Sequence, residues 1–156
     1  MKKLLLFGSM LLLAFTVTAC DRNSLHREDI NNEENNTESN TIKLTVGDKT
    51  FTAALADNSS AKALKELLAE GSISIDMRDY ANMEKVGPLG TSLPRNDEHI
   101  TTAPGDLILY QGNSFVIYYA PNTYSLTRLG KIDNVTRDEL IDALGSGNIT
   151  VTLSLN

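Results

Sequence analysis

Short segments in which apolar and polar residues alternate are the feature that most constrains the fold of this chain. Residues 42–46 and 49–55 alternate in this way on either side of Gly47 and Asp48, which favour a tight turn. A period of two is typical of a strand with one buried face, so this pair predicts a β-hairpin. Further strands are expected over residues 72–78, 106–110, 114–119, 124–132 and 149–155.

Two stretches have helical spacing instead. Apolar residues at positions 63, 64, 67 and 68 share one face of a helix that Asn58 or Ser59 can cap, and Gly71 can end it. Thr136 and Glu139 have the spacing of a capping box, which predicts a second helix that stops at Gly145.

Many short antiparallel strands with two short helices favour a particular fold class. Closing the sheet into a barrel removes the exposed edges that such strands otherwise leave. We therefore expect a mainly β protein, built as a closed β-barrel with two short helices.

Residues 79–105 do not fit a minimal barrel. They have no strong periodicity and contain three prolines and three glycines, so we expect a connection of about 27 residues without regular structure. Connections of this length more often carry function than not, which makes this segment the expected place of a binding site.

The same segment has the signature of a known family. The run IDMRDYANMEKVGPLGTSLPRND (residues 75–97), together with PGDL at 104–107, YQG at 110–112 and TRLGK at 127–131, resembles the bacterial cyclophilin-like domain family. The resemblance covers nearly all of residues 41–156. It implies a closed cyclophilin-like β-barrel with two helices.

The resemblance implies no settled activity. Cyclophilins that isomerise X-Pro bonds use an arginine preceded by Phe-His, a Phe-Met-x-Gln-Gly-Asp stretch, and a later tryptophan and histidine. Here Arg78 follows Met77, and the chain has no tryptophan. No residue is therefore carried over as catalytic, and the sequence leaves the catalytic residues unknown. Some relatives are joined to flavodoxin-like domains.

The N-terminus predicts where the protein is found. Lys2 and Lys3 precede an apolar run, and Val17-Thr18-Ala19-Cys20 resembles the lipobox of bacterial lipoproteins. We expect residues 1–19 to be a signal peptide and Cys20 to be lipidated, which would anchor the protein to a membrane of the bacterial cell envelope. Residues 20–40 are then the lipidated cysteine and a disordered acidic linker, and residues 41–156 are the cyclophilin-like domain.

Charge and residue types exclude several classes of partner. The net charge is −6, and removal of Lys2 and Lys3 with the signal leaves 12 basic residues against 20 acidic ones, so binding to nucleic acid is not expected. The two histidines are far apart and Cys20 is the only cysteine, so we expect no metal site. No sequence motif indicates a cofactor.

Candidate ligand-binding residues cluster around the start of the 79–105 segment. Asp76, Arg78, Asp79, Glu84 and Lys85 form either a set of structural ion pairs or a polar site in which Arg78 donates to a ligand. Tyr80 and Met83 could line an apolar pocket or pack as ordinary side chains. Tyr118 and Tyr119 point to opposite faces of one strand, so only one of them is expected in the core. The ligand-binding set predicted from the sequence is Arg78, Tyr80, Met83, Glu84, Tyr110 and Tyr119.

Three functions remain open from the sequence. The first is binding of a peptide, protein or small ligand without catalysis, in a groove bordered by residues 78–98. The second is a divergent peptidyl-prolyl isomerase that acts on envelope proteins. The third is an accessory of a flavin-dependent redox system.

Overall fold

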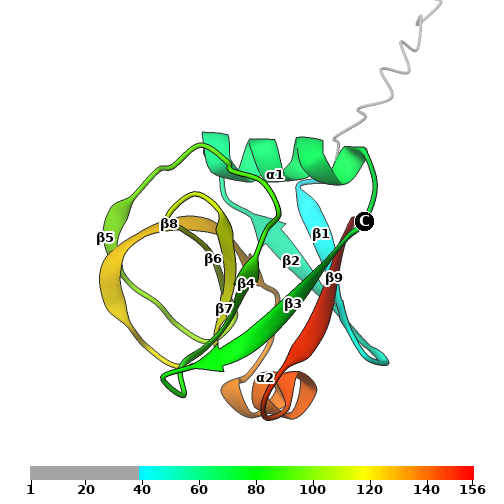
Figure 1. Ribbon diagram of the computed structural model, residues 1–156, viewed down its shortest axis with the longest axis vertical. Coiled ribbons are helices and arrows are strands. Elements are labelled where there is room, and N and C mark those ends of the chain that lie inside the picture. The colour runs from blue at the N-terminus through cyan, green and yellow to red at the C-terminus, as the bar shows by residue number, and fades with distance from the viewer. Residues whose placement is uncertain (1–38) are drawn as a thin grey trace, which may run out of the picture. The chain divides into compact units, whose positions relative to one another are not determined.

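The computed structural model describes residues 39–156. In this part of the chain, nine strands and two helices follow one another along the sequence (Figure 1). Their bounds are β1 Thr41–Val46, β2 Lys49–Leu55, α1 Ser59–Ala69, β3 Ile73–Tyr80, β4 Glu84–Pro88, β5 Glu98–Thr101, β6 Asp106–Tyr110, β7 Ser114–Tyr118, β8 Thr123–Ile132, α2 Arg137–Leu144 and β9 Ile149–Leu155. The predicted signal peptide of residues 1–19, the lipidation site Cys20 and nearly all of the predicted linker lie outside the described residues.

Eight of these strands form a closed ring. The order of hydrogen-bonded neighbours runs β2-β1-β9-β3-β4-β7-β6-β8, and an additional pairing of β2 with β8 closes it. Each of the pairings is antiparallel. The expected mainly β fold, a closed barrel with two helices, is therefore confirmed. The ninth strand, β5, lies outside the ring and pairs only with the first part of β8.

The two helices lie at opposite ends of the barrel (Figure 1). Asn58 caps α1 by accepting a hydrogen bond from the backbone N–H of Ala61 at 2.9 Å, and the capping box of Thr136 and Glu139 begins α2. Both helices turn leucines inward, and these are buried in the main core with the inward residues of the strands. They are Leu64 and Leu68 of α1 and Leu140 and Leu144 of α2.

The expectation of one irregular connection over residues 79–105 is wrong. The segment contains the end of β3, all of β4 and the edge strand β5. Strand β4 was missed because its alternation is masked: Lys85, a charged residue, points into the barrel and is fully buried, while Val86 points outward. A charged residue at an inward position interrupts the alternation of apolar and polar residues, so the segment is predicted as a loop.

The longest irregular part that remains, residues 89–97, is fixed to the barrel. The side-chain oxygen of Asn96 accepts hydrogen bonds from the hydroxyl of Ser60 at 2.7 Å and from its backbone N–H at 3.1 Å. The backbone N–H of Asn96 in turn donates to the Thr127 hydroxyl at 2.9 Å. These contacts tie the segment to the first turn of α1 and to β8, and so fix the position from which β5 begins.

Neither helix of residues 39–156 is long and apolar enough to cross a lipid bilayer.

Candidate functional site

The outer face of one half of the barrel is unusually apolar. Residues directly paired across adjacent strands point to the same side of a sheet. One such row crosses four strands as Arg78, Val86, Val116 and Ile108. The next row holds Tyr80, Glu84 and Tyr118. An outward face of a barrel is expected to be polar, so the apolar residues of this face require an explanation.

These outward residues form a second hydrophobic cluster, separate from the main core, which we call the outer-face cluster. Its centre is buried: the exposed fractions there do not exceed 3%. Its margin is partly exposed and is supplied by the turn before β4, by β4 itself, and by β5 and β6. The central residues are Ile108, Val116, Tyr118 and Leu126, and the marginal residues are Met83, Val86, Ile100 and Tyr110.

Two tyrosines extend this margin into solvent. Tyr80 is 58% exposed and Tyr124 is 53% exposed, and they are the exposed large hydrophobic residues of the described chain. The rings of Tyr124 and Tyr110 lie 6.4 Å apart, centroid to centroid, at a tilt of 55°. Exposed aromatic rings at the edge of a partly open apolar cluster are typical of binding surfaces.

Glu84 is the acidic group of this surface. It is 8% exposed and forms a hydrogen bond with Tyr118, whose hydroxyl also accepts a hydrogen bond from the Asn122 amide at 3.1 Å. Burial raises the pKa of the Glu84 carboxyl above its usual value, although the hydrogen bond to Tyr118 acts in the opposite direction. Burial and the neighbouring Glu84 together raise the pKa of Tyr118, which stays a neutral hydroxyl at physiological pH.

Arg78 stands at the other edge of the same face. Its side chain is exposed, directly across from Val86, and it forms no ion pair within residues 39–156. An unpaired guanidinium beside an apolar row can donate two parallel hydrogen bonds to a carbonyl or carboxylate.

Five of the six ligand-binding residues predicted from the sequence share this face. Arg78, Tyr80 and Glu84 lie on paired positions of β3 and β4, and Met83 and Tyr110 pack against the outer-face cluster. The sixth, Tyr119, turns to the opposite side and belongs to the main core. Both Tyr118 and Tyr119 are buried, because the outer-face cluster covers the one that points outward.

Tyr119 belongs to a different polar group, on the inner side of β3 and β4. Its hydroxyl donates to Asp79 at 3.1 Å, and the fully buried Lys85 ammonium donates to the same carboxylate at 2.9 Å. Lys85 also donates to the carbonyl of Gly147 at 2.6 Å, and the Gly147 N–H donates to Asp79 at 2.8 Å. The charged cluster seen in the sequence is thus divided between the two faces, and its Asp79–Lys85 part is an internal ion pair.

The pKa values of this internal group follow from its contacts. Burial acts to raise the pKa of Asp79, but the hydrogen bonds from Lys85, Gly147 and Tyr119 outweigh it, so the pKa lies below its ordinary value. Burial and the bond to Asp79 raise the pKa of Tyr119 to about 12. Every polar atom of the group is hydrogen-bonded, as is typical of a buried polar group that stabilises the fold.

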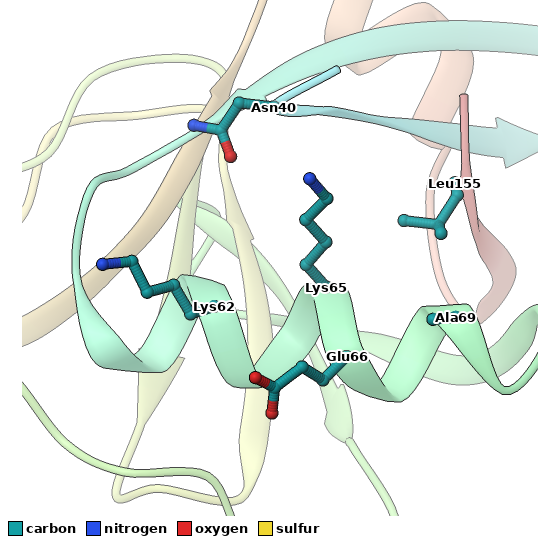
Figure 2. Close-up of a pocket in the computed structure, with 6 residues that line it drawn as sticks. All are labelled: Asn40, Lys62, Lys65, Glu66, Ala69 and Leu155. Carbon is teal, nitrogen blue, oxygen red and sulfur yellow. The ribbon is translucent and has the colours of Figure 1, made fainter. Parts of the chain in front are cut away.

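Three cavities of the described residues have no outer-face cluster residue in their lining. One of them, about 470 Å³, is at the α2 end and is lined by residues that include Asp79, Tyr119 and Arg137. A second, about 370 Å³, lies beside α1, where Figure 2 shows Lys62, Lys65 and Glu66 on the helix. Asn40, just before β1, and Leu155 of β9 also line it. A third, about 280 Å³, lies between Pro88 and Ser114 at the end of the apolar face.

Within the described residues, histidine, cysteine and acidic side chains form no group of three that could hold a metal ion.

The sequence did not single out Val86, Tyr118 or Asn122 as part of this surface. Val86 and Tyr118 belong to it because β4 pairs with β7, and that pairing is between strands about 30 residues apart. The period-two pattern of residues 84–88 was the one available signal, and the inward Lys85 concealed it.

Comparisons with known proteins place the chain in a family. The model of the cyclophilin-like family matches residues 44–154. Among solved structures, the solution structure of the hypothetical protein AF2241 from Archaeoglobus fulgidus matches with a TM-score of 0.58 and 8% identity, over 76% of this chain and 95% of that one. The structure of McbB in complex with tryptophan matches with a TM-score of 0.51 and 19% identity, over 72% of this chain and 44% of McbB.

Among curated proteins, none matches this sequence. The two structural likenesses, both under 25% identical, show the fold alone. The family match covers more than half of the chain, including each strand of the outer face. The chain therefore belongs to the cyclophilin-like family.

Proposed function

We propose that the barrel binds an extended peptide segment, without catalysis, on the outer face of β3, β4, β7 and β6. The binding surface, which we call the outer-face site, consists of Arg78, Tyr80, Met83, Glu84, Val86 and Tyr110. The observation that carries the proposal is the partly open apolar cluster on the outside of a closed barrel, with Tyr80 and Tyr124 exposed at its margin.

The shape of the surface favours a peptide over a small molecule. Small ligands are bound in concave pockets that cover most of their surface, and none of the three cavities described above for residues 39–156 is lined by a residue of the outer-face cluster. An extended chain needs only a shallow surface, because it makes many separate contacts along its length.

Four residues of the site have distinct roles in this proposal. Val86 and Met83 form the apolar floor, and Tyr80 supplies a large exposed ring for a peptide side chain. Arg78 is free to donate to a peptide carbonyl, because it has no ion pair in the described chain. No residue of the site is given a catalytic role.

The binding test uses an array of peptides of about ten residues, which span about 33 Å when extended. The labelled full chain is applied to the array, and the affinity of the strongest binder is then measured by fluorescence anisotropy. Arg78→Ala and Tyr80→Ala should each weaken binding by about tenfold, as expected for residues that contribute more than 1 kcal/mol to an interface.

Lys43→Ala is the matched control for Arg78→Ala. Lys43 is also an exposed cation on the outer face of a strand, but it lies on β1, away from the proposed site. The control should bind as the wild-type chain does. The proposal fails if the folded chain binds none of the peptides, or if Arg78→Ala and Tyr80→Ala bind them with unchanged affinity.

We also propose that Cys20 is lipidated and holds the domain at a membrane of the bacterial cell envelope. The sequence Val17-Thr18-Ala19-Cys20 after an apolar run supports this. Cells that express the chain and are fed a labelled fatty acid should incorporate the label into it, and Cys20→Ser should abolish labelling and release the protein from the membrane fraction. Equal labelling of both chains would contradict the proposal.

A second candidate function is prolyl isomerisation. It is favoured by the position of Arg78, an unpaired cation directly across from the apolar Val86. Isomerisation needs no bond cleavage, so an apolar surface with one cationic donor could lower its barrier of about 20 kcal/mol. A protease-coupled isomerisation assay with wild type and Arg78→Ala decides this: acceleration that the variant loses would support catalysis, and no acceleration by the folded chain would exclude it.

A further inference from the structure

Buried carboxylates in this protein differ in whether a cation accompanies them. Asp106 is 2% exposed, and its two oxygens lie 3.1 Å from the Arg128 guanidinium and 3.3 Å from the Lys131 ammonium. Asp79 lies 2.9 Å from Lys85. Glu84 is 8% exposed, and no lysine, arginine or histidine nitrogen of residues 39–156 lies within 4.0 Å of it. Glu84 is the buried carboxyl for which the fold supplies no cation in the part of the chain described.

The strand pairing explains why the fold leaves Glu84 without a cation. Its neighbours, Asp79 and Lys85, point into the barrel, because adjacent residues of a strand alternate between faces. The residues paired with it on either side are Tyr80 and Tyr118. Arg78 shares its face but is opposite Val86, a diagonal neighbour about 7–8 Å away in such a ladder.

Glu84 thus lies between an exposed and a buried aromatic ring, at the margin of an apolar cluster. Removing a carboxylate from water without a counter-ion costs free energy. A cation on a bound ligand would offset part of this cost. Aromatic faces also attract cations, and Tyr80 is 58% exposed, so its ring is available to a ligand. The acidic character of the whole chain, with a net charge of −6, attracts such a ligand from solution.

We infer that the outer-face site selects peptides that carry a lysine or arginine next to an apolar or aromatic residue. Glu84 is the counter-ion of the cationic side chain, and the ring of Tyr80 packs against that side chain. This inference rests on the proposed function, because it names the class of peptide that the same site binds. The Arg78 guanidinium, which lies across from Val86, then donates hydrogen bonds to a backbone carbonyl or a carboxylate of the same peptide.

The protonation of Glu84 gives the inference a further consequence. Its raised pKa shows that the carboxyl holds a proton more readily than usual where no cation is present. A bound cation and a proton compete for the same group, so binding of a cationic peptide should weaken as the pH falls through the pKa of Glu84. The other ionisable groups that face it are Tyr118 of β7, Tyr80 and Arg78 of β3 and Tyr110 of β6.

The test uses two peptides that differ at one position. The first is acetyl-Ala-Phe-Lys-Phe-Ala-amide, and in the second norleucine replaces lysine, which keeps the aliphatic stem and removes the charge. Binding of both to the full chain is measured by calorimetry near neutral pH. The lysine peptide should bind about fivefold more tightly or better, which corresponds to about 1 kcal/mol.

Glu84→Gln is the decisive variant, and Glu66→Gln is its control. Glu66 is an exposed glutamate on α1, so its replacement removes the same charge from a distant surface. Glu84→Gln should bind the two peptides equally, while Glu66→Gln should keep the preference for lysine. Circular dichroism confirms that each variant is folded.

The outcomes separate this inference from the proposed function. If both peptides bind equally to wild type, and Tyr80→Ala weakens both, then the outer-face site exists and the inference of a cationic ligand is wrong. If the preference for lysine survives in Glu84→Gln, Glu84 is not the counter-ion and the inference is likewise wrong. If neither peptide binds to the folded wild-type chain, the inference falls, and the peptide array decides separately on the proposed function.

Discussion

Glu84 is the residue whose proposed role as a counter-ion also affects the stability of the fold. Its carboxyl is buried beside Tyr118 on the outside of the barrel, with no cation near it in the described chain. A group whose pKa is raised by folding binds protons more tightly in the folded state than in the unfolded state. Glu84 therefore contributes stability below the pKa of an ordinary glutamate, and this contribution is lost as the pH rises through its raised pKa.

The exchange of Glu84 for glutamine should stabilise the protein at neutral pH. Glutamine keeps a hydrogen-bonding group beside Tyr118 and removes the buried charge, so the midpoint of urea unfolding should rise near pH 7. Below the ordinary pKa of glutamate, about 4.3, the two chains should have nearly the same stability, since Glu84 is then protonated in both states. A variant that is less stable than wild type near pH 7 would contradict this account of the carboxyl.

Ala81 is a second unfavourable residue, because alanine rarely adopts its left-handed backbone conformation. It has a φ of +52° in the turn between β3 and β4, followed by Asn82 at +54°, and the Met83 N–H donates to the Tyr80 carbonyl at 3.1 Å. Two left-handed residues are typical of a type I′ turn, in which alanine is rare and glycine or asparagine is common.

Ala81→Gly should therefore stabilise the fold by about 0.5–1 kcal/mol. This is the free-energy cost of alanine in the left-handed conformation minus the larger backbone entropy that glycine loses on folding. Ala54→Gly is the control, since Ala54 is exposed in the regular strand β2, and there glycine should destabilise by a similar amount. Urea unfolding of the two variants measures both effects. If both substitutions destabilise equally, the turn is not strained.

At the scale of elements, the internal group of Asp79, Lys85, Tyr119 and Gly147 joins β3 and β4 to the segment between α2 and β9. Lys85 is fully buried and the Asp79 side chain is 31% exposed. When one partner of a buried ion pair is removed, the other remains as an uncompensated charge, whereas apolar replacement of a pair can be nearly neutral.

We expect Asp79→Ala to destabilise the protein by about 2–4 kcal/mol, less than for a fully buried pair because Asp79 is partly exposed. The double variant Asp79→Ala with Lys85→Met should recover at least half of this loss, since it removes the stranded ammonium. Thermal and urea unfolding give both values. A double variant that is less stable than Asp79→Ala would show that Lys85 contributes through contacts other than the ion pair.

The elements that the sequence predicts well are those whose pattern is local. The hairpin of β1 and β2, the capping box of α2 and the closing strand β9 all carry their own periodicity or cap residues. Strand β4 does not, because Lys85 fills an inward position, where it contacts Asp79 of β3 and the carbonyl of Gly147 in the loop after α2. Its alternation becomes visible only when that distant partner is known.

At the scale of the whole molecule, barrel closure decides which residues meet. The pairing of β2 with β8 and of β4 with β7 joins segments far apart in the sequence, and it leaves little room at some crossings. A Cβ atom on Gly87 would lie 2.4 Å from the Asp76 carbonyl oxygen, and one on Gly130 would lie 2.4 Å from the Ala54 carbonyl oxygen. These contacts account for glycine in the EKVGPLG and TRLGK runs on which the family resemblance rests.

The sequence brings the candidate residues near one another along the chain, and the strand pairing divides them in space. The charged and aromatic residues after position 75 do gather at one place, yet the sequence could not divide them between two faces. Tyr119 and Asp79 turned inward and Arg78, Tyr80 and Glu84 turned outward because of strand alternation that depends on the position of β4. The outer-face cluster takes its residues from several strands, including β4, β6 and β7, and for this reason no single segment of the sequence predicts it.

The central claim is that ligands bind on the outer face of β3, β4, β7 and β6. The most direct test is to label the full chain with ¹⁵N, titrate it with the strongest binder from the peptide array, and map the amide chemical-shift changes. The account predicts that the changes are largest at Arg78, Tyr80, Glu84 and Val86 and extend to Tyr110 and Tyr118. Changes confined to the cavity at the α2 end, around Arg137 and Ser146, or to the α1 cavity beside Lys62 would contradict it.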